Sequence, residues 1–155
     1  MVLANRKAVL ILTLSVIILA SSMFISTASA QGDSPISIFY SGHVSFSILG
    51  AEGLYPAKSV ATVRISSAEG VRLHFKATPL EYQGAAKEKY VLDVTYSVSC
   101  DGGNYSFKPQ DYLTIKELKG GEHELTVSGV VQIKSIEGQA AGPYRGTICV
   151  TVCAP

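Results

Sequence analysis

Apolar and polar residues alternate along most of the chain after residue 40. In residues 70–77, GVRLHFKA, the apolar side chains of Val71, Leu73, Phe75 and Ala77 are separated by charged or polar ones. This period of two is typical of an antiparallel strand with one buried face and one face in water. The same pattern predicts strands in six segments: 43–49, 59–66, 70–77, 90–100, 123–136 and 146–152.

Glycine, proline and asparagine separate these runs, as turn residues do. Asp101-Gly102-Gly103-Asn104 divides two predicted strands, and Gly120-Gly121 precedes another. Short strands at this spacing predict one all-β domain over residues 31–155, a single antiparallel immunoglobulin-like β-sandwich of about seven to nine strands. Gly129 falls on the apolar face of its strand, which predicts a bulge or a close backbone contact there.

Residues 1–30 have the pattern of a secretory signal peptide. Arg6 and Lys7 precede a stretch over residues 8–26 without charge, and Ala28-Ser29-Ala30 ends it with small residues. We expect cleavage near Ala30–Gln31 and a secreted protein, extracellular or at the cell surface. The alternative is an uncleaved signal anchor, because the apolar stretch is nearly long enough to span a bilayer.

Charge gives no sign of a nucleic-acid partner. Without Arg6 and Lys7, 11 of the 13 basic residues remain against 12 acidic ones, a net charge of −1. No run of like charges occurs, so we expect no nucleic-acid binding, and no membrane contact once the signal peptide is removed.

The sequence offers no recognisable catalytic motif. His43, His74 and His123 lack the close spacing of paired metal ligands, and the stretch GGEHEL around His123 is typical of a solvated strand entry. No nucleophile elbow or nucleotide-binding loop is present. We therefore expect no catalytic residues, no metal site and no cofactor, and the protein is not expected to be an enzyme.

The three cysteines predict a disulfide, because secreted proteins form them readily. Cys149 and Cys153 are about 13 Å apart in a continuous strand, too far to bridge each other. Cys100 is therefore expected to pair with Cys153 or with Cys149, with Cys153 slightly favoured. The remaining thiol is either free or cross-links subunits.

The segment 124–152, ELTVSGVVQIKSIEGQAAGPYRGTICVTV, resembles the two closing strands of pilin-like secreted β-sandwich families. These include spore coat protein U-like and fimbrial subunit-like domains and a related bacterial domain family of unknown function. The resemblance implies that Gly142, Tyr144, Gly146 and Thr147 form the turn and entry of the last strand. The residues that would form its apolar face are Ile148, Val150 and Val152.

This resemblance implies a non-enzymatic structural subunit of a pilus, coat or extracellular filament. Its expected partners are further copies of itself or related surface subunits, with a secretion chaperone in addition. Such subunits polymerise by donating an N-terminal strand to a neighbour. Residues 36–41, with Ile36, Ile38 and Tyr40 alternating, form either that donor strand or the domain's own first strand; the strand predicted directly after them favours the second.

The alternative function is a secreted binding module, an adhesin or a carbohydrate-binding sandwich. Four tyrosines expected in loops are the candidate ligand contacts: Tyr55, Tyr82, Tyr105 and Tyr112.

Overall fold

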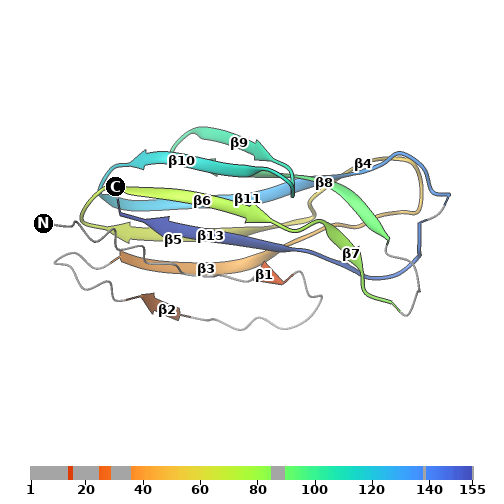
Figure 1. Ribbon diagram of the computed structural model, residues 1–155, viewed down its shortest axis with the longest axis horizontal. Helices are drawn as coiled ribbons and strands as arrows, with labels where there is room; N and C mark the ends of the chain where they lie inside the picture. The colour runs from red at the N-terminus through yellow and green to blue at the C-terminus, as the bar shows by residue number, and fades with distance from the viewer. Residues whose placement is uncertain (1–13, 16–24, 29–35, 85–89, 138, 155) are drawn as a thin grey trace, which may run out of the picture.

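A computed structural model describes residues 36–84, 90–137 and 139–154, together with the backbone of residues 14–15 and 25–28. These residues form an antiparallel β-sandwich (Figure 1), which confirms the predicted fold class. Eleven strands follow residue 35, more than the seven to nine expected. None of the described segments is a helix of the length and apolarity that a membrane crossing requires.

The larger sheet has the strand order β12-β7-β8-β11-β5-β3, with β4 paired to β11 and β9 paired to β8. Its strands are β3 (Ile36–Ser45), β4 (Gly53–Pro56), β5 (Ser59–Ser67), β7 (Leu80–Tyr82), β8 (Val91–Cys100), β9 (Gly103–Phe107), β11 (Gly121–Ile133) and β12 (Tyr144–Arg145). The smaller sheet has the order β13-β6-β10, formed by β6 (Val71–Ala77), β10 (Tyr112–Leu118) and β13 (Thr147–Cys153).

Two short strands from the expected signal peptide lie on the outer edges of these sheets. β1 (Leu14–Ser15) pairs with β13, and β2 (Ile25–Ala28) pairs with β3. Figure 1 shows β13 and β3 toward the same side of the sandwich, with β1 and β2 beyond them. The other residues of the predicted signal peptide, including the cleavage junction after Ala30, lie outside the described residues.

The core lies between the two sheets and is formed by the alternating apolar positions. On β6, Leu73 and Phe75 have no exposed surface. The ring of Phe107 lies 6.2 Å from that of Phe75 and 5.7 Å from that of Tyr96, so aromatic contacts join the smaller sheet to the larger one. The alternation predicted for 59–66, 70–77 and 90–100 is confirmed by the burial pattern of β5, β6 and β8.

The prediction of a strand at 43–49 is wrong in its bounds. β3 instead continues from residue 36 to Ser45, and its register with β5 shifts between Gly42 and Ser45. Gly42 has a φ of 76°, and a Cβ there would lie 2.8 Å from the carbonyl oxygen of Val60. The strand ends soon after this bulge, and Ile48, expected inside, has 36% of its surface exposed.

Strand β10 was not predicted, because a bulge breaks its alternation. Its register with β6 shifts between Ile115 and Leu118, and Glu117 has a φ of 59°. The extra residue brings both Ile115 and Leu118 to the buried face although they are three positions apart. A period-two pattern in the sequence does not detect a strand of this kind.

Of the two features predicted at Gly129, a bulge or a close backbone contact, the structure has the close contact. Gly129 pairs in regular register with Tyr96. A Cβ at this position would lie 3.0 Å from the carbonyl oxygen of Thr95 and 3.3 Å from both Tyr96 and Phe46. The absence of a side chain lets the aromatic rings of the core pack directly on β11.

Candidate functional site at the outer edge of β13

Strand β13 alternates strictly between the core and the outer face of the smaller sheet. The apolar residues of the closing motif, Ile148, Val150 and Val152, are buried. Cys149, Thr151 and Cys153 are half-buried on the opposite face. The β-branched residues therefore anchor the strand, and both of its thiols lie on the outward face.

The entry to β13 is fixed by hydrogen bonds from its turn. The hydroxyl of Tyr144 donates to the carbonyl of Ala140, 2.8 Å away. The backbone N–H of Thr147 donates to the hydroxyl of Thr78, and the carbonyl of Thr147 accepts from the N–H of Thr78, each at 2.8 Å. The strand therefore begins at a defined residue.

The two glycines of this turn allow close packing. Gly142 has a φ of 144°, and a Cβ there would lie 2.8 Å from the Tyr82 ring. A Cβ at Gly146 would lie 3.0 Å from the Pro79 carbonyl and 3.1 Å from the buried Tyr96 hydroxyl. Gly142 thus lies in the turn before β12, Tyr144 begins β12, and Gly146 and Thr147 lie at the entry to β13.

The backbone of β13 exposes hydrogen-bonding groups on its outer edge. The backbone N–H and carbonyl of Thr147 both point toward Thr78. In an antiparallel ladder the direction of these backbone groups alternates from residue to residue, so those of Ile148, Val150 and Val152 point away from β6. β1 pairs with Thr147 and Ile148 only. Beyond Ile148, no strand of the described residues pairs with this edge.

The three cysteines are free thiols, so the structure lacks the expected disulfide. Cys100 lies at the buried end of β8, whereas Cys149 and Cys153 lie on the outer face of β13. The expectation failed because two partners on the outward face of one sheet cannot readily reach a side chain buried in the other. Burial, reinforced by the neighbouring Asp101 carboxylate, raises the pKa of the Cys100 thiol to about 11.

Residues 36–41 pair within the same chain. In β3, Ile38 lies opposite Ile65 and Tyr40 opposite Val63 of β5, and Ile38 is buried. Ile36 and Tyr40 are half-buried against the core. This arrangement is that of a first strand of the domain.

His123 is not in a solvated strand entry, contrary to the sequence expectation. Its side chain is only 11% exposed and lies beside Cys100 and Asp101. These three residues are the ones in the described part of the chain that could hold a metal ion together. His43 is exposed on β3, and His74 on β6 forms a 2.9 Å hydrogen bond with the Thr114 hydroxyl.

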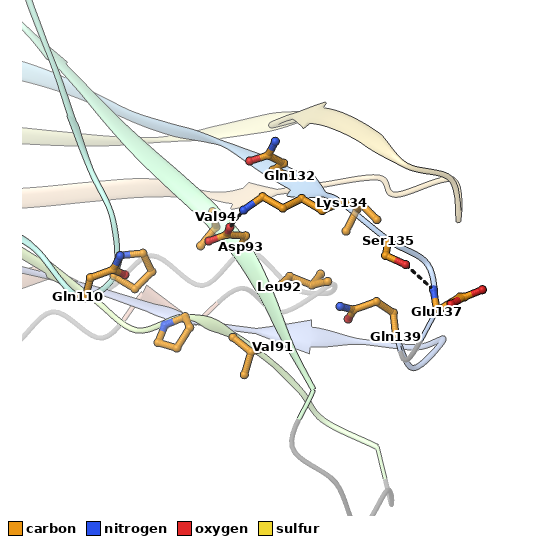
Figure 2. A pocket seen from close by; sticks show the side chains of 13 residues that line it. Val91, Leu92, Asp93, Val94, Gln110, Gln132, Lys134, Ser135, Glu137 and Gln139 are labelled. Atoms are coloured by element: carbon orange, nitrogen blue, oxygen red, sulfur yellow. Dashed lines mark hydrogen bonds and ion pairs between the residues drawn. The ribbon is translucent and has the colours of Figure 1, made fainter.

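A shallow hollow of about 410 Å³ lies where β8 begins, beside the end of β11 (Figure 2). Figure 2 shows the Asp93 carboxylate reaching the Lys134 ammonium, at 3.1 Å, on its border. Amide side chains contribute much of the polar lining: Gln110, Gln132 and Gln139. No aromatic side chain is among its described lining residues.

The candidate tyrosines do not gather around this hollow. Tyr82 packs against the rings of Tyr90 and Tyr144, at 5.9 and 5.5 Å. The Tyr55 hydroxyl donates to the carbonyl of Ala51. Tyr112 is 70% exposed, with the Lys76 ammonium 5.4 Å from the centre of its ring.

Comparison with known proteins adds no relative: the chain matches no family model, no curated protein and no solved structure. The resemblance of residues 124–152 to pilin-like families therefore remains an expectation from the sequence.

Proposed function

We propose that this chain is a secreted, non-enzymatic structural subunit of a cell-surface or extracellular assembly, and that its copies associate through the outer edge of β13. The observation that carries the proposal is that edge: an ordered strand whose outward N–H and carbonyl groups have no described partner beyond Ile148. Such an edge is a template for strand addition. A second copy of the chain offers the same edge, so the outward N–H and carbonyl groups of each copy bond to those of the other.

The spacing of the two thiols on β13 selects a register for this pairing. When two copies of β13 pair antiparallel about a two-fold axis at Thr151, Cys149 of each copy lies opposite Cys153 of the other. Because the outward hydrogen bonds belong to Val150 and Val152, the cysteine pair is of the non-hydrogen-bonded type, with Cα atoms about 4.5 Å apart. That separation lies within the range of disulfides, so the symmetric pair forms two bridges.

Each bridge requires an oxidant. Two thiols lose two protons and two electrons when the S–S bond forms. Oxidised glutathione accepts both electrons and leaves as two reduced glutathione molecules. The half-buried position of Cys149 and Cys153 gives the oxidant access.

Residues 1–30 regulate access to the edge in this proposal. β1 pairs Ser15 with Thr147 and Leu14 with Ile148, at the start of the outer edge. While this segment is attached, it competes with a second copy. Its removal at the expected cleavage site leaves the whole edge open, which couples assembly to secretion.

Strand β3 provides a second edge, through which dimers extend into a longer assembly. β2 pairs along it from Ile25 opposite Phe39 to Ala28 opposite Ile36. A two-fold contact at β13 alone closes a dimer, whereas a further contact at β3 continues the chain of subunits.

The cysteine register is tested on the secreted protein, with its N-terminus verified by mass spectrometry, after oxidation by glutathione. We expect a covalent dimer on a non-reducing gel for the wild type and for Cys100→Ser. Cys149→Ser and Cys153→Ser each abolish it, because every bridge needs one of each. A cross-linked dimer that persists in either of these variants contradicts the register.

The extension through β3 is tested by electron microscopy with a matched pair of variants. Ser37 on β3 and Ser66 on β5 are cross-strand partners and both exposed, but only Ser37 lies on the outer strand. Ser37→Lys introduces repulsion at the edge and is expected to shorten assemblies to dimers, whereas Ser66→Lys leaves them unchanged. Equal lengths in the two variants contradict a role for the β3 edge.

The binding-module alternative has less support. A carbohydrate site stacks sugars on exposed aromatic rings, whereas Tyr55 and Tyr82 are held by contacts within the fold. Tyr112 is exposed, but the Lys76 ammonium lies over its ring. The hollow beside Asp93 is polar but lacks such a ring among its described residues.

A further inference from the structure

We propose that Cys100, Asp101 and His123 form a binding site for a thiophilic divalent cation of the Zn²⁺ type. The three residues offer a thiol sulfur, a carboxylate oxygen and an imidazole nitrogen that all lie within 4.8 Å of one another. This site is separate from the β13 edge and does not depend on the proposed assembly.

The fold brings the three ligands together at one end of the larger sheet. Cys100 is the last residue of β8, and Leu125 on β11 lies opposite it. His123 is two residues before Leu125, so its side chain lies on the same inward face of β11, just beyond the end of β8. Asp101 begins the tight turn into β9, in which Asp101 and Gly102 have φ values of 47° and 80°. Positive φ at both residues is the geometry of a type I′ hairpin, and it returns the Asp101 carboxylate over the strand end.

The hydrogen bonds of His123 prepare its Nδ1 to bind a cation. Its Nε2 lies 2.6 Å from the carbonyl oxygen of Lys119, which only accepts, so Nε2 carries a hydrogen. Its Nδ1 faces the Asp101 carboxylate at 2.7 Å. With Nε2 donating to Lys119, Nδ1 and the carboxylate oxygen face each other as two groups that a metal ion can bind together.

The contact with Lys119 is the one that metal-binding histidines make. Such histidines usually donate the second ring N–H to a backbone carbonyl or a carboxylate, which fixes the tautomer and the ring orientation. In His123, this contact comes from the turn between β10 and β11. The side chain is 11% exposed, so the ring is held in place by its surroundings.

The ligand set determines the kind of cation. At the usual Zn–S, Zn–N and Zn–O bond lengths, tetrahedral ligand atoms lie about 3.3 to 3.7 Å apart. The His123 Nδ1 and the Asp101 carboxylate oxygen, 2.7 Å apart without the ion, must therefore separate by less than about 1 Å to admit it. A thiolate and an imidazole do not suit Mg²⁺ or Ca²⁺, which take oxygen ligands. Binding converts the Cys100 thiol to a thiolate and releases its proton to water.

Cobalt(II) is the direct probe, because a cobalt–thiolate bond gives a charge-transfer band in the near ultraviolet and tetrahedral Co²⁺ gives visible bands. We expect the reduced protein to bind one Co²⁺ with both signals, and Zn²⁺ to displace it. A titration of the same protein that gives no thiolate band at saturating Co²⁺ overturns the proposal and leaves His123 and Asp101 as a plain ion pair.

Variants identify the ligands. Cys100→Ser is expected to remove the charge-transfer band, and His123→Gln to weaken Co²⁺ binding at least roughly 10-fold. His74→Gln and the double variant Cys149→Ser/Cys153→Ser are the matched controls and retain the signal. A band that disappears in the double variant and persists in Cys100→Ser also overturns the proposal, because it places the cation on β13.

Folding is checked in each variant by circular dichroism. In the wild type, Zn²⁺ is expected to raise the midpoint of thermal unfolding, since a ligand that binds the native state stabilises it. In folded Cys100→Ser and His123→Gln protein, Zn²⁺ should not raise the unfolding midpoint. An equal increase in wild type and variants contradicts the site.

Discussion

The cysteine at the end of β8 and the two on β13 occupy opposite kinds of environment. Cys100 is 4% exposed, points between the sheets and lies beside Asp101 and His123. Cys149 and Cys153 are half-buried on the outward face of an outer strand, where they lie opposite Lys76 and Arg72 of β6.

This difference shows how one residue type can serve two roles in a single sandwich. A thiol at the inward end of a strand has neighbours fixed by the fold, so it is suited to hold a ligand. Thiols on the outer strand have β6 on one side only, and on the other side they meet whatever pairs with that edge, so they are suited to join chains. The position of each thiol on its strand, and not the C-x-x-x-C spacing, decides its chemistry.

Thiol labelling gives the largest expected contrast. In metal-free, reduced protein at a pH below 9, the raised pKa of Cys100 leaves it with roughly 100-fold less thiolate than an ordinary cysteine has, and burial slows the reagent further. Iodoacetamide is therefore expected to modify Cys149 and Cys153 at least about 100-fold faster, as followed by peptide mass spectrometry.

The pH dependence has a defined sign. As the pH rises from 9 toward 11, the thiolate fraction of Cys100 increases and its labelling should accelerate. Equal rates for the three thiols at neutral pH would remove the basis of the comparison.

Serine substitutions give a smaller contrast, in stability. Cys100→Ser buries a hydroxyl in place of a thiol and is expected to lower the free energy of unfolding by about 1–3 kcal/mol. Cys149→Ser and Cys153→Ser, on the outward face, are expected to stay within about 0.5 kcal/mol of the wild-type monomer. Urea denaturation under reducing conditions measures all three, and a larger loss for the β13 variants would contradict the assignment of faces.

Tyr144→Phe and its control give the smallest expected contrast, at the entry to β13. Tyr144→Phe removes the hydroxyl that donates to Ala140, at a cost of about 1 kcal/mol. Tyr105→Phe, at an exposed ring on β9, is the matched control and should change little. Indistinguishable denaturation midpoints in the two variants would show that this hydrogen bond does not stabilise the turn.

Most of the sandwich could be predicted because its strands keep a period of two. The alternation in β6, β8 and β13 is uninterrupted, and burial follows it residue by residue. Two failures come at bulges, where one extra residue changes the phase: Gly42 in β3, and Glu117 in β10. A local pattern does not reveal such a residue when its cause is pairing with a strand elsewhere in the chain. The strands β4, β7, β9 and β12 were also missed, because two to five residues are too few to show a period of two.

The candidate metal site could not be predicted from spacing. His123 lies 22 residues after Asp101, and the two meet because β11 pairs directly with β8. The Asp101-Gly102 turn was visible in the sequence as a hairpin signal, but its effect on the carboxylate follows only from the two positive φ values. The absence of the Cys100 bridge likewise depends on which face of β13 carries its thiols.

Mixing two variants that each lack one cysteine of β13 tests the central claim most directly. Cys149→Ser retains Cys153, and Cys153→Ser retains Cys149, so neither forms the bridged dimer alone. Mixed in equal amounts and oxidised with glutathione, they are expected to form a heterodimer joined by one disulfide between Cys153 of the first variant and Cys149 of the second. A mixture that remains as uncross-linked as the separate variants would contradict the proposed pairing of β13 with β13.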